Sequence, residues 1–219
     1  MEKFAGDKKV GSSILSGPEN RFKFWAVPKL PCWLETNHLT MMTLVWSVMN
    51  VLLAYAAAHS LQWLWAVSVM IVLQYVTDLF DGELGRQRET GLIKWGFYMD
   101  HFLDFLFLCS LVFVGYKICP AGLEAWYFAL LVVVGGFMVN SFLAFAATNE
   151  FQIYYWGLGP TEMRVGFIVI NTFIVIRGTG DFGSLLPVTV ILSATGLALN
   201  TWFIQRTLWA HDMEVKRQT

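Results

Sequence analysis

The chain has 219 residues, of which 56% are hydrophobic and 14% are charged, whereas an ordinary soluble domain carries about 25% charged residues. Its net charge of −1, without a basic stripe, gives no indication of nucleic-acid binding. The three cysteines match neither a paired disulfide framework nor a zinc-binding pattern, so we interpret them as packing residues. The 18 Phe and 10 Trp residues suit a lipid-facing surface with interfacial aromatics.

The first 30 residues are polar and basic and lack the apolar core of a signal peptide, so we expect a cytosolic tail. Residues 21–28 mix basic and aromatic side chains, which is typical of a segment at the membrane interface. Residues 1–19 are equally compatible with an unstructured tail. We therefore assign residues 1–37 to an N-terminal tail and interfacial segment.

Six apolar stretches follow, and a helix needs about 20 apolar residues to span a bilayer. The expected spans are Leu39–Ala58, Gln62–Phe80, Phe97–Ile118, Ala125–Ala147, Val165–Ile176 and Leu185–Ile204. The fifth is short and needs its flanks to cross. Helix-breaking residues lie between spans at 120–122, 157–160 and 178–183. We expect an all-α integral membrane fold, with six transmembrane helices in residues 38–206 and a cytosolic tail at 207–219.

The basic residues predict the orientation of these spans, because lysine and arginine are enriched on the cytosolic side. If the N-terminus is cytosolic, 13 of the 15 lysines and arginines lie inside, and only Lys117 and Arg177 lie outside. This asymmetry places both termini and the loops 81–96 and 148–164 on the cytosolic side.

Four aspartates lie at the ends of two consecutive predicted spans. Asp78 and Asp81 end the second span, and Asp100 and Asp104 lie near the start of the third. Separations of three and four residues place each pair on one helical face. Because both pairs lie at the cytosolic ends of adjacent antiparallel helices, we expect all four carboxylates to converge. Ionisable groups in a span are costly, which indicates a functional site.

A divalent cation would relieve the repulsion between four neighbouring carboxylates. Hard oxygen ligands favour Mg²⁺ or Mn²⁺, and two such ions could hold the attacking and leaving oxygens of a phosphoryl displacement. Gly82, directly after the second aspartate, would let a phosphate approach the backbone. Arg86 would supply a permanently charged donor for a diphosphate. The sequence therefore predicts a metal-dependent phosphotransfer site.

These residues resemble the signature of the CDP-alcohol phosphotransferase family, written D-x-x-D-G-x-x-A-R-x8-G-x3-D-x3-D. The chain departs from it at two points: Gly85 replaces the alanine, and nine residues instead of eight separate Arg86 from Gly96. Neither departure removes a predicted metal ligand or the arginine. The likeness covers about residues 30–205, and the family's helix number matches the six predicted spans.

The resemblance implies a role for each matched residue. The implied metal ligands are Asp78, Asp81, Asp100 and Asp104, and the residues implied to hold the CDP group are Gly82, Gly85 and Arg86. Asp104 would contact the second metal and act as general base on the acceptor hydroxyl. The resemblance also implies a CDP-alcohol donor, release of CMP in phospholipid synthesis, and a homodimer.

Three further stretches resemble the choline/ethanolamine phosphotransferase branch, which transfers a phospho-aminoalcohol to diacylglycerol. Residues 31–40 resemble its P-x-W-x-A-P-N-x-x-T motif without the Ala-Pro, and Asn37 and Thr40 match it. Residues 100–104 resemble D-H-G-x-D, with Phe102 in place of glycine, and residues 159–162 resemble part of N-G-P-T-E-G. This resemblance implies that Asn37, Thr40 and Glu162 belong to the donor site and that diacylglycerol is the acceptor.

Two of these residues keep alternative interpretations. His101 could assist proton removal beside Asp104, because an unperturbed imidazole titrates near neutrality, or it could simply be satisfied by a neighbouring helix. Glu162 could balance the charge of a choline or ethanolamine headgroup, or only solvate a loop. The tryptophans lie mostly at span ends, which favours interfacial anchoring over a choline-binding cage.

Two other functions stay open on the sequence. A CDP-diacylglycerol-dependent phosphatidyltransferase would use a small soluble alcohol such as serine, inositol or glycerol phosphate. A phosphorylated acceptor should need basic residues near the metals, where the later spans offer only Arg164 and Arg206. A metal-binding transporter or scaffold would place acidic residues along a path through several helices, whereas here they gather at one predicted mouth.

Overall fold

The computed structural model describes residues 9–10, 16–149, 151–152 and 159–218. Its α-helices are α1 (Ser16–Ala26), α2 (Thr36–His59), α3 (Leu64–Gln87), α4 (Ile93–Ile118), α5 (Glu124–Thr148), α6 (Pro160–Arg177) and α7 (Phe182–Gln218). Short 3-10 helices cover Val27–Lys29 and Leu61–Trp63, and the two-residue strands β1 (Lys9–Val10) and β2 (Phe151–Gln152) pair in parallel. The predicted all-α fold is confirmed.

The helices end where the sequence has turn-forming residues. The α4–α5 connection contains Pro120 and Gly122, the latter with a φ of 89°. Asn149 ends α5 in the left-handed conformation that asparagine tolerates, and Gly178 follows α6 with a φ of 76°. Pro160 opens α6, where its fixed φ suits the first turn. The predicted breaks at 120–122 and 178–183 are therefore confirmed, whereas residues 157 and 158 lie outside the described residues.

Within the described residues, five helices are long and apolar enough to cross a membrane: α2, α3 with its preceding 3-10 turn, α4, α5 and α7. The shorter α6 has 18 residues and carries three charges, on Glu162, Arg164 and Arg177. Because α6 has only 18 residues, all three charges fall within the length that would have to cross the membrane, whereas each of the other five helices is longer and contains an 18-residue apolar stretch with at most two charges. The structure thus supports a multi-pass membrane protein, and the sixth span stays a prediction.

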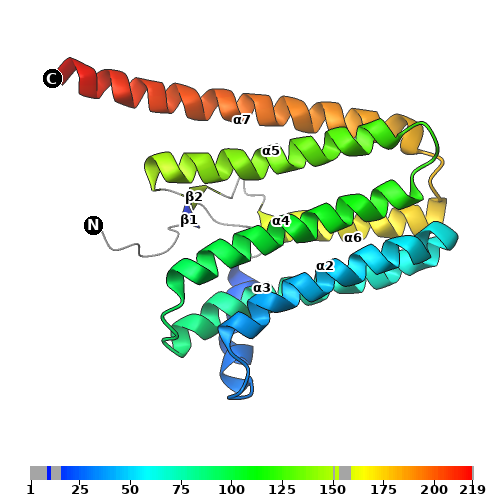
Figure 1. The fold of residues 1–219 in the computed structure, drawn as a ribbon, viewed down its shortest axis with the longest axis horizontal. Coiled ribbons are helices and arrows are strands. Elements are labelled where there is room, and N and C mark those ends of the chain that lie inside the picture. The colour runs from blue at the N-terminus through cyan, green and yellow to red at the C-terminus, as the bar shows by residue number, and fades with distance from the viewer. Residues whose placement is uncertain (1–8, 11–15, 150, 153–158, 219) are drawn as a thin grey trace.

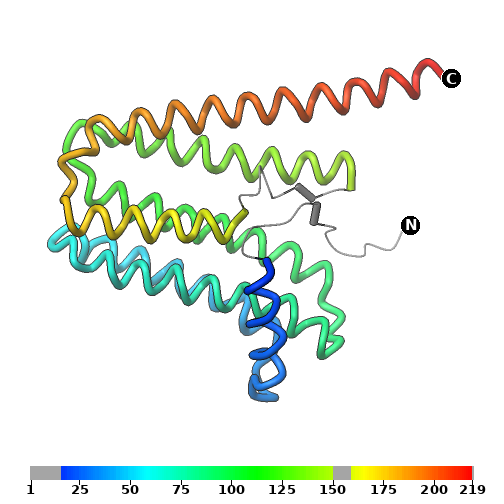
Figure 2. Tube along the Cα trace, turned by 180° about the vertical axis from the view of Figure 1, so that it is seen from behind, coloured from blue at the N-terminus to red at the C-terminus, as the bar shows by residue number. Residues whose placement is uncertain are grey.

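The long helices form two groups (Figure 1). Helix α2 packs against both α3 and α4, and α6 lies along α3 on the other side (Figure 2). Helix α5 joins this group to α7 by packing against both α4 and α7. The core between α2, α3 and α4 contains small and branched side chains, including Ala54, Ala57 and Val67, which are at most 1% exposed. These small residues allow α2 to approach its neighbours closely.

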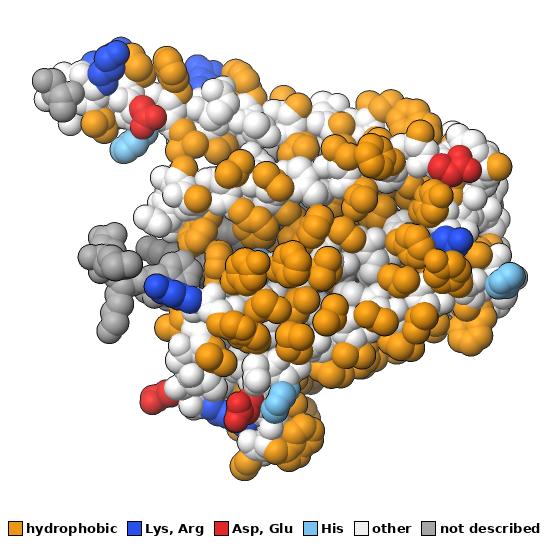
Figure 3. Space-filling model, viewed as in Figure 1, with side chains coloured by type: hydrophobic (Ala, Val, Ile, Leu, Met, Phe, Trp, Pro, Cys, Tyr) orange, Lys and Arg blue, Asp and Glu red, His pale blue; other side chains and the backbone are white. Residues whose placement is uncertain are grey.

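Apolar side chains cover most of the face of the bundle that Figure 3 shows. Leu52, Phe128 and Val169 are 57%, 70% and 61% exposed, respectively. Charged side chains gather toward the ends of the helices in the same view, leaving a broad apolar surface between them. Such a surface is unfavourable in water and is the surface that a lipid bilayer covers.

The two predicted tails are partly helical. Helix α1 begins at Ser16, so part of the segment 1–37 is ordered, although residues 1–8 and 11–15 lie outside the described residues. Helix α7 continues through the predicted boundary at residue 206 to Gln218. Its 37 residues correspond to about 55 Å at 1.5 Å per residue, longer than a hydrocarbon core of about 30 Å. Part of α7 therefore extends beyond the bilayer.

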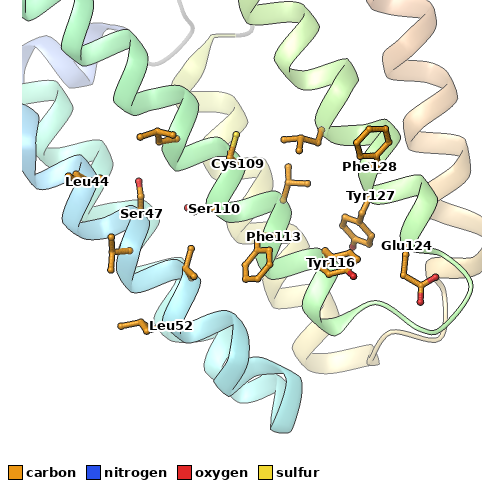
Figure 4. Close-up of a pocket in the computed structure, with 15 residues that line it drawn as sticks. Leu44, Ser47, Leu52, Cys109, Ser110, Phe113, Tyr116, Glu124, Tyr127 and Phe128 are labelled. Carbon is orange, nitrogen blue, oxygen red and sulfur yellow. The ribbon is translucent and has the colours of Figure 1, made fainter.

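A cavity of about 630 Å³ lies between α2, α4 and α5 (Figure 4). Its lining is almost entirely apolar and includes Leu44, Phe113 and Phe128, with Glu124 near the α4–α5 turn. None of the four aspartates singled out by the sequence lines it. This cavity is thus separate from the predicted phosphotransfer site.

Candidate active site

Three of the four predicted carboxylates converge. Asp78 lies on α3, and Asp100 and Asp104 lie one turn apart on α4. Each offers an oxygen, and these oxygens all lie within 4.8 Å of one another. The two helices run in opposite directions and are joined by a short turn, so the end of α3 meets the start of α4 (Figure 1). All three side chains are partly buried, which leaves the cluster open to a ligand.

Asp81 is turned toward α2 instead. It is 6% exposed, and its Oδ2 accepts a 2.6 Å hydrogen bond from the Thr40 hydroxyl. Its Oδ1 is buried and has no hydrogen-bond partner. The expected convergence therefore holds for three carboxylates, and the fourth is held by a different helix with one acceptor oxygen unused.

Arg164, from α6, lies against the three-carboxylate cluster. Its Nη2 donates to Asp78 Oδ2 at 2.8 Å and lies 3.8 Å from Asp104 Oδ1. The side chain is only 13% exposed. Sequence reasoning counted this arginine as a positive charge directly before the fifth expected span and gave it no contact.

Gln74 is a second residue that sequence reasoning missed. It is completely buried on α3, one turn before Asp78, and its Nε2 donates a 2.8 Å hydrogen bond to Asp104 Oδ1. A buried amide in an apolar span, four residues before a predicted ligand, shares the ligand's helical face. This spacing could have indicated that Gln74 orients a carboxylate of the cluster.

The three residues predicted to hold the CDP group lie along the last turns of α3. A Cβ added to Gly82 would meet only the Arg86 side chain, at 3.5 Å, so the backbone there is accessible. Arg86 is 65% exposed and pairs with Glu83 at 2.9 Å. Gly85 faces α2, and a Cβ there would lie 3.1 Å from Thr36 Oγ1. Gly82 and Arg86 therefore border open space, whereas Gly85 permits close helix packing.

The start of α2 belongs to the same region. Thr40 reaches Asp81, as described above, and the Oδ1 of Asn37 is buried without a hydrogen-bond partner. Arg88, at the C-terminal end of α3, donates to the carbonyl oxygens of Leu30, Pro31, Cys32 and Leu34. This guanidinium fastens the segment before α2 to the end of α3, a contact that sequence reasoning missed.

A comparison with protein-family models matches residues 33–203 to the CDP-alcohol phosphatidyltransferase family. The match covers most of the chain and includes every residue of the site described above except Leu30, Pro31 and Cys32. The chain belongs to the CDP-alcohol phosphatidyltransferase family. It is therefore a membrane-embedded transferase of phospholipid synthesis that uses a CDP-alcohol donor and an alcohol acceptor. A search of curated proteins found no match.

The family depends on a divalent metal, and the residues of this site fit one. Three carboxylates already lie within 4.8 Å of one another, and the buried, unpartnered Oδ1 of Asp81 provides a further acceptor nearby on α3. Oxygen-only donors suit hard cations such as Mg²⁺ and Mn²⁺ better than Zn²⁺ or Cu²⁺. Asp78, Asp100 and Asp104 would hold the cation, with Asp81 as the predicted fourth ligand.

The structure gives His101 and Glu162 local contacts. His101 Nδ1 lies 2.7 Å from the Phe97 carbonyl oxygen, and its ring packs against Phe97 and Phe142. Its Nδ1 is also 3.9 Å from Asp100. Glu162 Oε2 accepts a 2.8 Å hydrogen bond from the Gly159 N–H, which caps the start of α6. Their predicted catalytic and donor-binding roles stay predictions.

Proposed function

We propose that this family member transfers phosphocholine or phosphoethanolamine from its CDP ester to the hydroxyl group of diacylglycerol, with release of CMP. The observation that carries the proposal is the convergence of Asp78, Asp100 and Asp104 at one end of α3 and α4. The motif segments 31–40 and 159–162 lie on elements that meet this end, through Thr40 on α2 and Arg164 on α6.

In the proposed reaction the hydroxyl oxygen of diacylglycerol attacks the phosphorus that carries the aminoalcohol. A new P–O bond forms, and the bond between this phosphorus and the bridging oxygen of CMP breaks. CMP leaves with that oxygen, and the hydroxyl proton passes to a carboxylate of the enzyme. Mg²⁺ or Mn²⁺, in one or two ions, would supply neutralising charge for the phosphate oxygens.

Asp104 is the proposed base for the hydroxyl proton. Gln74 donates to its Oδ1 and thereby fixes the orientation of the carboxylate. Positioned proton transfer of this kind contributes roughly 10²- to 10⁴-fold to a rate. His101 lies on the same helix, three residues earlier, and is the proposed assistant in moving this proton away. Gly82 and Arg86 would receive the CDP phosphates on the open side of α3.

The charge balance of the site supports a cationic headgroup. Arg164 pairs with the three-carboxylate cluster and is already bound to Asp78. A phosphorylated acceptor would need additional positive charge here, whereas choline or ethanolamine brings its own. Glu162, two residues before Arg164 on α6, is the proposed counter-charge for the amine.

The second candidate is transfer of a phosphatidyl group from CDP-diacylglycerol to a small alcohol such as serine or inositol. The description of the matched family, a phosphatidyltransferase family, favours it. The chemistry at phosphorus would be the same, because an alcohol would again displace CMP. The two candidates differ in which substrate carries the acyl chains.

One assay separates the candidates. Purified protein is given Mg²⁺ or Mn²⁺ with CDP-choline, CDP-ethanolamine or CDP-diacylglycerol in parallel, and CMP release is measured with diacylglycerol or soluble alcohols as acceptors. We expect CMP release from CDP-choline or CDP-ethanolamine that requires diacylglycerol, and none from the Asp78→Asn variant. Turnover of CDP-diacylglycerol alone would replace our proposal with the second candidate.

A further inference from the structure

Arg164 is placed where a bound cation would also have to be. Its guanidinium lies 2.8 Å from Asp78 and 3.8 Å from Asp104, two of the three carboxylates that form the predicted metal site. The third, Asp100, also attracts the guanidinium charge. Because the arginine side chain is only 13% exposed, water and salt screen these attractions less than at an open surface.

A metal ion cannot simply be added to this arrangement. Mg²⁺ binds carboxylate oxygens at about 2.1 Å, so it must approach the carboxylates that the guanidinium contacts. Two positive charges at such a distance repel strongly where the effective dielectric constant is low. The Arg164–Asp78 hydrogen bond must therefore weaken or break when an ion is held by Asp78 and Asp104.

We propose that Arg164 is the internal counter-ion of the metal-free site and competes with the divalent cation for Asp78. In the metal-free enzyme the guanidinium stabilises carboxylates that would otherwise repel one another, and cation binding displaces it. This inference rests on the proposed metal site. In this role Arg164 lowers the affinity of the site for the cation. Because Arg164 lies on α6, cation binding would also change the contact between α6 and Asp78.

The competing explanation is a structural one, in which Arg164 only fastens α6 to α3. The two explanations predict opposite changes in cation affinity when Arg164 is replaced. Removing a competitor tightens cation binding, whereas removing a structural fastener loosens the carboxylates and weakens binding. Cation affinity measured without substrate thus distinguishes them, and it does not depend on catalytic activity.

The test is Mn²⁺ titration of the full-length protein in detergent, followed by electron paramagnetic resonance of the free ion. We compare the parent with Arg164→Gln and Arg164→Met. Methionine has a side chain of similar length to arginine but is apolar and uncharged. Arg177→Gln is the matched control, because it removes the same charge from an exposed position 13 residues along α6, about 20 Å away. Asp78→Asn removes one of the three predicted metal ligands and so tests whether Mn²⁺ binds at this site.

We expect both neutral replacements at Arg164 to lower the dissociation constant of Mn²⁺ about tenfold, the scale of one hydrogen bond to a charged group. The Arg177→Gln variant should bind like the parent, and Asp78→Asn should bind more weakly. Unchanged or weaker binding in both Arg164 variants overturns the competition, while the metal site stands. A parent that binds no Mn²⁺ overturns the metal site and the competition together.

Discussion

At the scale of single residues, three of the four carboxylates of the site are held by partners from different parts of the fold. Asp78 contacts Arg164 from α6, and Asp104 accepts from Gln74 on α3. Asp81 is bound by Thr40 from α2. Charged acceptors in a partly buried site are costly unless they receive hydrogen bonds, and these partners supply them. The four carboxylates also differ in exposure: Asp81 is buried, whereas Asp78, Asp100 and Asp104 are only partly buried and stay accessible to a ligand.

The contribution of the Thr40–Asp81 hydrogen bond to stability can be tested by substitution. Thr40→Val keeps the shape of the side chain and removes the hydroxyl that donates to Asp81 Oδ2 at 2.6 Å. We expect the free energy of unfolding to fall by about 1.5–3 kcal/mol, the range for a hydrogen bond to a charged group. Thermal unfolding in detergent without metal measures it. Thr40→Ser keeps the hydroxyl and should lose much less; equal losses in both variants would contradict the assignment.

Glu162 combines a capping contact that the structure shows with a donor contact that we propose. Glutamine can replace glutamate in a capping box, so Glu162→Gln keeps the cap on the Gly159 N–H and removes only the charge. We expect the KM for CDP-choline or CDP-ethanolamine to rise about tenfold, as for a lost charge-assisted contact, with Mn²⁺ affinity unchanged. Steady-state CMP release measures it.

The matched variant for this prediction is Glu162→Ala, which loses both the charge and the cap. If Glu162 only caps α6, the glutamine variant keeps the parental KM and the alanine variant alone is impaired. That pattern would remove Glu162 from the donor site.

At the scale of elements, the end of α3 packs unusually closely on the start of α2. The close approach involves Gly85 and Thr36, and both depart from the patterns that the chain otherwise resembles, which have alanine and proline at these positions. The structure therefore connects two departures that seem unrelated along the chain. Arg88 strengthens the same junction through the carbonyl oxygens of residues 30–34.

This junction predicts a coupled pair of substitutions. In Gly85→Ala the new Cβ would lie 3.1 Å from Thr36 Oγ1, below the usual contact distance of about 3.5 Å. We expect a net loss of about 1 kcal/mol, because overpacking outweighs the better helix propensity of alanine. Thr36→Ala removes the obstacle at little cost, since the Thr36 hydroxyl is buried without a hydrogen-bond partner.

In the Thr36→Ala background, Gly85→Ala should therefore become neutral or stabilising by up to about 1 kcal/mol. Thermal unfolding of the parent, the two single variants and the double variant measures the coupling. Strictly additive effects would show that the two residues do not constrain each other.

At the scale of the whole molecule, the apolar belt and the carboxylate cluster together define an orientation. The cluster lies at the end of the bundle where α2 and α4 begin, beside the segment that contains Cys32. The opposite end contains the α4–α5 and α6–α7 connections, including Gly180. We propose, from the distribution of lysine and arginine, that the cluster faces the cytosol.

Thiol labelling tests this orientation. Cys32 is exposed, so a membrane-impermeant maleimide should label a variant retaining only this cysteine in inside-out vesicles and not in intact cells. Gly180→Cys in a cysteine-free background is the matched control, because a Cβ at Gly180 has no neighbour within 4 Å. It should show the opposite pattern. Labelling of Cys32 from outside the cell would reverse the proposed sidedness.

The sequence by itself determined the helical membrane fold and the metal-dependent chemistry of its family. Both depend on local information: apolar runs set the helices, and spacings of three and four residues set which aspartates share a face. For this reason both ends of α5, the C-terminal end of α4 and the pairing of Asp100 with Asp104 could be predicted closely. The fifth expected span was the shortest of the six, and the structure sets the corresponding helix, α6, apart from the other five.

Only the tertiary structure decided which partner each carboxylate has. Arg164 lies 86 residues after Asp78, and Thr40 lies 41 residues before Asp81, so neither contact follows from helical periodicity. Such contacts depend on how helices rotate and pack against one another, which is determined by side chains along their whole length. Packing therefore turned Asp81 toward α2, brought Gln74 and Arg164 into the site, and placed Gly85 against Thr36.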